Sequence, residues 1–180
     1  MASRYGLDYE LEAEFEDAAE LEQLLEQADE ALYESPPRGG GGGVVTMPPE
    51  VIIPLNVHRL TLRRFLLDSA QLNNASPDPA HSRTLSALAE VIVRRHGTTK
   101  RVTRLRFVGH ADHAGTIDFN IDLGLRRART VRRALQHFLG ARTVLTSGFT
   151  MPAIEECSAG KSRPDSSDRA ANRRVEVFID

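Results

Sequence analysis

Residues 101–139 predict a strand that is followed, after a short connection, by the longest helix of the chain. This order limits the chain to folds built from strand–helix units. Residues 101–110, RVTRLRFVGH, alternate between two faces, which is typical of a β-strand with two different surfaces. Residues 117–139 repeat apolar side chains at helical spacing and predict the strongest helix. A helix that follows a strand so closely packs back on the sheet containing that strand. We therefore expect a sheet layer covered by a helix layer.

The other segments give the order of elements. Residues 55–65 alternate and predict a first strand, and residues 81–97 predict a helix that stops at Gly97. Residues 142–148 predict a third strand, 150–170 a polar loop, and 173–179 a fourth strand. The order β-α-β-α-β-β favours an α+β sandwich, with the helices packed on one face of a mixed four-stranded sheet.

Charge divides the chain into three parts. Residues 1–35 hold 12 acids and one base, whereas the remainder holds 13 acids and 22 bases. Residues 36–49 contain five consecutive glycines and predict a flexible linker, and residues 50–180 form the predicted domain. Apolar and acidic residues alternate over 5–16, and residues 17–33 have the spacing of a short amphipathic helix. This acidic tail is either a solubilising segment or a docking segment for a protein partner.

We expect neither an export signal nor a membrane-spanning segment from this sequence. No apolar run approaches the ~20 residues that span a bilayer, so we expect no membrane insertion. The first residues, MASRYGLDYE, lack the basic and apolar regions of a signal peptide, and we expect synthesis in the cytoplasm without export by that route. The single cysteine, Cys157, excludes an internal disulfide framework.

The segment GHADHAG, residues 109–115, raises the question of catalysis. A catalytic zinc site needs three well-placed protein ligands, and His110, Asp112 and His113 give only a weak signal of one. No nucleophile motif accompanies them. We expect no enzymatic activity, no metal and no cofactor.

The helix over 117–139 has two different faces. Arg126, Arg129 and Arg133 lie on the face opposite the apolar one and attract polyanions at low salt. No tryptophan or aromatic platform is interleaved with them, so we expect no nucleic-acid binding. The predicted buried stripe consists of Ile121, Leu125, Ala128, Val131, Leu135 and Leu139.

A third set of residues lies at the rim of that stripe. Asn120, Gly124 and Arg127 share one line along the helix, and Asp112 lies in the glycine-flanked turn before it. A glycine inside a helix costs about 1 kcal/mol relative to alanine, which is understandable if a side chain there would block a ligand. Asp112 and Arg127 suit a zwitterion, with the carboxylate binding an ammonium group and the guanidinium a carboxylate. Alternatively, the two side chains simply pair with each other.

Residues 109–135, GHADHAGTIDFNIDLGLRRARTVRRAL, resemble the signature of the OmpA-like C-terminal domain, most closely in the branch of peptidoglycan-associated lipoproteins. The segment NRRVEVFI, 172–179, is similar to the closing strand of that family, and FLLDSAQL, 65–72, to a degenerate segment after its first strand. The turn GFTMP, 148–152, departs from the family pattern after the third strand, so the resemblance assigns no residues to that rim of the site. Residues 153–170 are expected to form an adjusted loop.

The resemblance implies non-catalytic binding of peptidoglycan through the meso-diaminopimelate of the stem peptide. It assigns Asp112 and Arg127 to the diaminopimelate, and carries Asn120, Asn172 and Arg173 over as further binding positions. It also implies action at the cell wall or in the periplasm.

Delivery to the wall is unexplained by the sequence, because the lipoproteins of this branch carry a signal and a lipid-modified cysteine. We expect the acidic tail to dock on a carrier, such as a phage-tail-like or contractile injection particle, or lysis to release the protein. The alternative is that the fold serves as an interaction module of an intracellular assembly and binds no peptidoglycan.

Overall fold

The computed structural model describes residues 50–180 except 76–79, 113–114, 145 and 161–168. The predicted acidic tail, its helix over 17–33 and the linker lie outside the described residues, as does His113. None of the described helices is both long enough and apolar enough to cross a bilayer. The elements are β1 (Arg59–Leu62), α2 (His81–Arg95), β2 (Arg104–His110), α3 (Ile117–Thr143), β3 (Ala153–Gly160), α4 (Arg169–Asn172) and β4 (Val175–Ile179).

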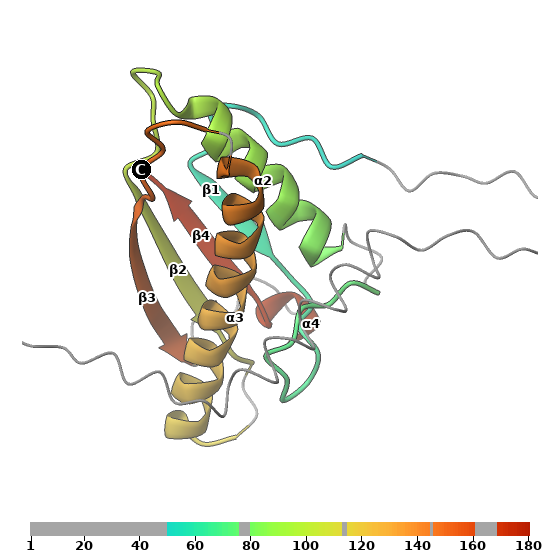
Figure 1. Ribbon diagram of the computed structural model, residues 1–180. Coiled ribbons are helices and arrows are strands. Elements are labelled where there is room, and N and C mark those ends of the chain that lie inside the picture. Colours follow the sequence, from blue (N-terminus) through green and yellow to red (C-terminus); the bar gives the residue numbers. More distant parts are fainter. Residues whose placement is uncertain (1–49, 76–79, 113–114, 145, 161–168) are drawn as a thin grey trace, which may run out of the picture. The chain divides into compact units, whose positions relative to one another are not determined.

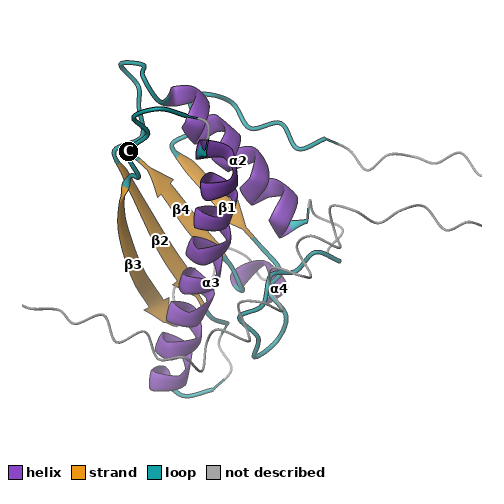
Figure 2. Cartoon of the chain, viewed as in Figure 1, coloured by secondary structure: helices purple, strands orange, loops and turns teal. Residues whose placement is uncertain are grey.

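The strands form one mixed sheet in the order β1-β4-β2-β3 (Figure 1). The strand β4 is antiparallel to both neighbours, whereas β2 and β3 are parallel. The helices α2 and α3 lie on one face of this sheet (Figure 2). Between these layers lies an apolar core that includes Phe65, Phe107 and Val177. The predicted α+β fold is confirmed.

Strand direction places three loops at one edge of the sheet. Because β4 is antiparallel to both β1 and β2, and β3 is parallel to β2, the strands β1, β2 and β3 all end at the same edge. The segments after β1 and β2, the start of α3 and the connection into β4 meet there (Figure 1). This edge therefore brings together residues that are far apart in the sequence.

The third strand does not lie where the sequence predicted it. Helix α3 continues to Thr143, and the third strand is Ala153–Gly160, inside the segment predicted as a polar loop. The strand is polar because its inward Glu156 forms ion pairs with Arg129 and Arg132 of α3 instead of entering an apolar core. The turn GFTMP leads into β3 rather than out of it, so it lies at the edge opposite the ends of β1 and β2.

The buried face of α3 also differs from the prediction. Ile121, assigned to the buried stripe, is 46% exposed, and Leu125 is only partly buried. Asn120, Gly124 and Arg127, expected at the rim, are buried. The helix is therefore rotated so that this line of residues, rather than Ile121, faces the sheet.

Two glycines explain the rotation. A Cβ atom at Gly124 would overlap the Ser158 hydroxyl and lie 2.7 Å from the Gly109 carbonyl oxygen, and one at Gly109 would overlap the Gly124 carbonyl. The helix and β2 thus touch backbone to backbone. The expectation that Gly124 keeps space free for a ligand is wrong, because Gly109 and Ser158 fill that space.

We expect Gly124→Ala to lower the free energy of unfolding by about 1–3 kcal/mol, since the methyl group forces α3 away from the sheet. Gly140, also in α3, has no atom within 4 Å of its Cβ position. Gly140→Ala should therefore raise the free energy of unfolding by about 0.5–1 kcal/mol, because alanine favours the helix. Urea denaturation of both variants measures the difference, and equal effects would contradict the close contact.

Candidate functional site

Arg127 lies at the centre of the edge where the strands end. Its side chain is completely buried and donates from three nitrogens to three backbone carbonyls. Nε–H bonds the Ser69 oxygen at 2.8 Å, Nη1–H the His110 oxygen at 2.9 Å and Nη2–H the Leu66 oxygen at 3.0 Å. One guanidinium thus joins the loop after β1 to the end of β2. These bonds use three of the five N–H donors that a guanidinium carries.

Burial lowers the pKa of Arg127 but leaves its side chain positively charged at neutral pH. Loss of hydration lowers the pKa of Arg127 to about 10, and the positive charge of Arg173 acts in the same direction. The charges of Asp112 and Asp68 oppose this effect. At neutral pH the side chain therefore stays charged, and two guanidinium groups lie close to one buried carboxylate.

Asp112 provides that carboxylate. It follows β2 directly, is only 6% exposed, and accepts a bond from Nη1 of Arg173 at 3.2 Å. Arg173 also donates Nε–H to the Phe65 carbonyl oxygen at 2.6 Å. The side chain of Arg173 is 17% exposed, so it is the part of this group that solvent reaches most readily.

The other predicted site residues lie around this centre. Asn120 is buried in the first turns of α3, a helix that Thr116 caps by accepting a bond from the Phe119 amide at 3.2 Å. Asn172 is buried at the end of α4, a short helix that the sequence did not predict. The structure therefore gathers Asp112, Asn120, Arg127, Asn172 and Arg173 at one edge, with Gly124 acting in helix packing.

Sequence reasoning missed the backbone groups that hold Arg127. The segment 65–72 was noticed only as a similarity of sequence, yet it supplies two of the three carbonyls that Arg127 binds. A side-chain pattern cannot reveal carbonyl acceptors that are 58 and 61 residues away.

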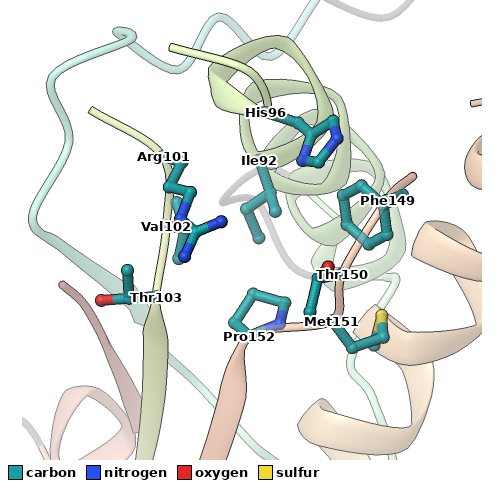
Figure 3. A pocket seen from close by; sticks show the side chains of 9 residues that line it. All are labelled: Ile92, His96, Arg101, Val102, Thr103, Phe149, Thr150, Met151 and Pro152. Carbon is teal, nitrogen blue, oxygen red and sulfur yellow. The ribbon is translucent and has the colours of Figure 1, made fainter. Parts of the chain in front are cut away.

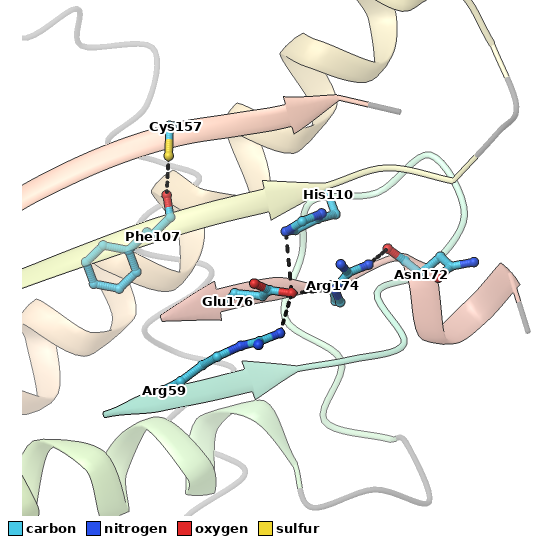
Figure 4. Close-up of polar contacts among 7 residues, drawn as sticks. All are labelled: Arg59, Phe107, His110, Cys157, Asn172, Arg174 and Glu176. Atoms are coloured by element: carbon cyan, nitrogen blue, oxygen red, sulfur yellow. Dashed lines mark hydrogen bonds and ion pairs between the residues drawn. The ribbon is translucent and has the colours of Figure 1, made fainter. Parts of the chain in front are cut away.

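A second cluster, of polar side chains around Glu176 of β4, lies on the sheet face opposite the helices (Figure 4). Glu176 accepts bonds from Nε of Arg174 at 2.8 Å and Nη2 of Arg59 at 2.9 Å, and Nε2 of His110 lies 3.7 Å away. The His110 amide donates to the Arg174 carbonyl oxygen at 2.8 Å. Since the His110 carbonyl accepts from Arg127, the cluster is connected to the buried arginine.

The surroundings of Glu176 predict a pH dependence of stability. Burial alone would raise its pKa, but the hydrogen bond from Arg174 and the charges of His110, Arg174 and Arg59 lower it below the ordinary value of 4.5. A carboxyl with a depressed pKa stabilises the fold above its unfolded pKa, and this contribution is lost as the pH falls. We expect Glu176→Gln to lower the free energy of unfolding by about 1.5–3 kcal/mol at pH 7. The difference between parent and variant should shrink below pH 4.5; a constant difference in urea titrations from pH 7 to 3 would contradict the assignment.

Exposed apolar side chains flank the charged centre. Leu66 and Leu67 belong to the loop bound by Arg127, and Ile117, Phe119 and Ile121 belong to the first turns of α3. All five are exposed. The edge thus offers a charged centre with apolar flanks, which suits a ligand that carries both ionic groups and aliphatic carbon.

A separate cavity lies at the opposite edge (Figure 3). It is lined by residues that precede β2 and β3, among them Arg101, Val102 and Pro152, and by His96, whose ring lies 5.1 Å from that of Phe149. Its volume is about 80 Å³, whereas typical ligand sites have volumes of about 300–1,000 Å³. Asp112 follows β2 whereas Val102 precedes it, so this cavity is not part of the candidate site.

The profile of the OmpA family matches residues 64–177. The chain is 36% identical over 82 residues to a peptidoglycan-associated lipoprotein of Legionella pneumophila and 37% identical over 79 residues to one of Pseudomonas aeruginosa. These matches cover 43% and 41% of this chain, and each spans only 42% of the relative's length. The crystal structure of the peptidoglycan-associated lipoprotein from Burkholderia pseudomallei is similar in fold, with a TM-score of 0.50 and 23% identity over 69% of this chain and 91% of that chain. The predicted family resemblance is confirmed.

Proposed function

Because the chain belongs to the OmpA family, we propose that it binds bacterial peptidoglycan without catalysing a reaction on it. The relatives named above are described as peptidoglycan-associated. The observation that carries the proposal is the buried carboxylate of Asp112, which lies beside Arg173 and within the charge field of Arg127. With the exposed Asp68 also acting on Arg127, the site holds charges of both signs, which suits a ligand group that carries an ammonium and a carboxylate.

The ligand group is the free end of meso-diaminopimelate in the stem peptide, where one carbon carries an ammonium and a carboxylate. Asp112 accepts from the ammonium, and the guanidinium groups donate to the carboxylate; such charge-assisted bonds are roughly twice as strong as neutral ones. The exposed leucines and the apolar residues of α3 pack against the aliphatic chain. Asn120 and Asn172 complete the walls of the site.

The two arginines have different tasks. Arg173 is partly exposed, so it makes the first contact with the ligand carboxylate. Arg127 is buried beneath it, adds positive charge, and keeps the loop after β1 in place through its three carbonyl bonds. Direct contact and support are thereby divided between two side chains.

Sedimentation with purified sacculi tests the function. The full chain should co-sediment with diaminopimelate-containing sacculi and should release no soluble muropeptides from them. If the folded protein stays in the supernatant, the interaction-module alternative replaces this proposal. If muropeptides appear, the non-catalytic assignment is wrong.

We infer that the acidic residues 1–35 attach the domain to a protein carrier, such as a phage-tail-like or contractile injection particle. The support is chemical: 12 acids and one base occupy these residues, in contrast to the base-rich remainder. Deletion of residues 1–43 should abolish incorporation into such a particle while sacculus binding persists. Unchanged incorporation would contradict the attachment role.

A further inference from the structure

The outer side of β1 opens into a groove that the proposed function does not use. Among the described strands, β1 pairs only with β4 and is the outermost strand on one side of the sheet. The groove beside it has a volume of about 470 Å³, within the range of known ligand sites. Its walls include Ile53, Val57 and Leu60, and the neighbouring Ile52 is 82% exposed.

The backbone of β1 is positioned to accept another strand. The Ile179 amide donates to the His58 carbonyl oxygen at 3.0 Å, and alternate residues of an antiparallel ladder share such bonds. In this register Leu60, opposite Val177, bonds to β4, whereas the N–H and C=O groups of Arg59 and Thr61 point toward the groove. An edge of this kind is a template for strand addition.

Side chains give the two sides of this edge different chemistry. Leu60 faces the helix layer together with Val57 and Ile53, so an added strand meets apolar groups on that side. Arg59 and Arg63 line the groove from the other side. Arg59 is half exposed even though one of its nitrogens bonds Glu176. The complement of this surface is an extended segment whose side chains alternate between apolar and acidic.

We propose that this groove binds such a segment of a partner protein as a fifth strand beside β1. Main-chain hydrogen bonds to Arg59 and Thr61 provide affinity, and the alternation of side chains provides selectivity. The partner's acidic residues lie beside Arg59 and Arg63, and its apolar residues beside Leu60. The groove lies outside the peptidoglycan site, so the two activities are separable.

Three synthetic peptides test the proposal on the full chain. Acetyl-EVEVEVE-amide has the required alternation, acetyl-VVVEEEE-amide has the same composition in blocks, and acetyl-KVKVKVK-amide has the opposite charge. By isothermal titration we expect the first to bind at least about tenfold more tightly than the others, a difference of about 1.4 kcal/mol. In NMR spectra it should shift the amide signals of Arg59 and Thr61. Equal binding of the block peptide, or shifts elsewhere only, overturns the proposal.

Variants separate strand addition from charge alone. Thr61→Pro removes an outward N–H that β4 does not use, and proline is tolerated at such edge positions; we expect loss of peptide binding with sacculus binding unchanged. Arg63→Glu should weaken binding of the acidic peptide about tenfold, whereas Arg94→Glu, the same charge change at an exposed residue of α2, should not. Thermal unfolding confirms that each variant is folded. If folded Thr61→Pro binds as the parent does, or if Arg94→Glu weakens binding as much as Arg63→Glu, the proposal is wrong.

Discussion

Arg127→Ala should lower the free energy of unfolding by about 3–5 kcal/mol, the largest stability effect of any substitution at the candidate site. The side chain is fully buried, and its removal takes one donor from each of the carbonyls of Leu66, Ser69 and His110, of which Leu66 keeps the Ser69 amide at 3.3 Å. Each buried group left without a hydrogen bond costs about 1–3 kcal/mol, and water that enters the space recovers part of this. Urea unfolding, followed by circular dichroism, measures the loss.

The adjacent Arg126 provides the matched control. It is exposed and pairs with Asp122 four residues earlier, an interaction worth about 0.3–0.5 kcal/mol. Arg126→Ala should therefore change stability by less than about 0.5 kcal/mol. Arg127→Lys restores the charge but not the three-way geometry, so it should recover only part of the loss. Equal effects at positions 126 and 127 would show that the carbonyl bonds contribute nothing measurable.

Asp112→Asn should weaken binding to diaminopimelate-containing muropeptide by at least about thirtyfold. Truncating one partner of a buried, hydrogen-bonded charge pair costs about 2–5 kcal/mol, and about 2 kcal/mol corresponds to that factor. Asparagine has nearly the same shape and still accepts a bond from Arg173, so the fold should persist. Isothermal titration with a purified muropeptide measures the affinity.

Asp122→Asn is the control for this substitution. Asp122 is an exposed carboxylate near the start of α3, and among the described residues it pairs only with Arg126. Its replacement should leave the affinity within about twofold. Unfolding curves distinguish loss of binding from loss of fold. If Asp112→Asn is folded and binds as the parent does, then Asp112 does not hold the ligand.

The strand–helix pattern predicted most of the fold because β2 and α3 follow apolar periodicity. The third strand escaped prediction because β3 is polar on its inward side: Glu156 is held by Arg129 and Arg132 from α3, and no local pattern shows such a tertiary ion pair. Residues 142–148, RTVLTSG, hold β-branched and apolar residues before a glycine and looked more like a strand than β3 did. The ion pairs between Glu156 of β3 and the arginines of α3, which only the fold brings together, therefore mark the third strand better than local apolar spacing does.

The fold brings the residues singled out in the sequence to one end of the sheet, but their bonds differ from those that the sequence suggested. The sequence placed Asp112 and Arg127 near each other, yet the acid bonds Arg173 and the arginine bonds backbone carbonyls. Gly124 was singled out as a glycine that leaves space for a ligand, whereas Gly109 and Ser158 occupy that space. These partners come from distant segments, and only the fold shows which ones meet.

The most direct measurement compares two muropeptides that differ only at the third stem residue, meso-diaminopimelate in one and lysine in the other. Lysine keeps the ammonium for Asp112 but lacks the carboxylate for Arg127 and Arg173. By isothermal titration, the account predicts that the diaminopimelate form binds the full chain at least about thirtyfold more tightly, which corresponds to about 2 kcal/mol. Equal affinities for the two forms would contradict it.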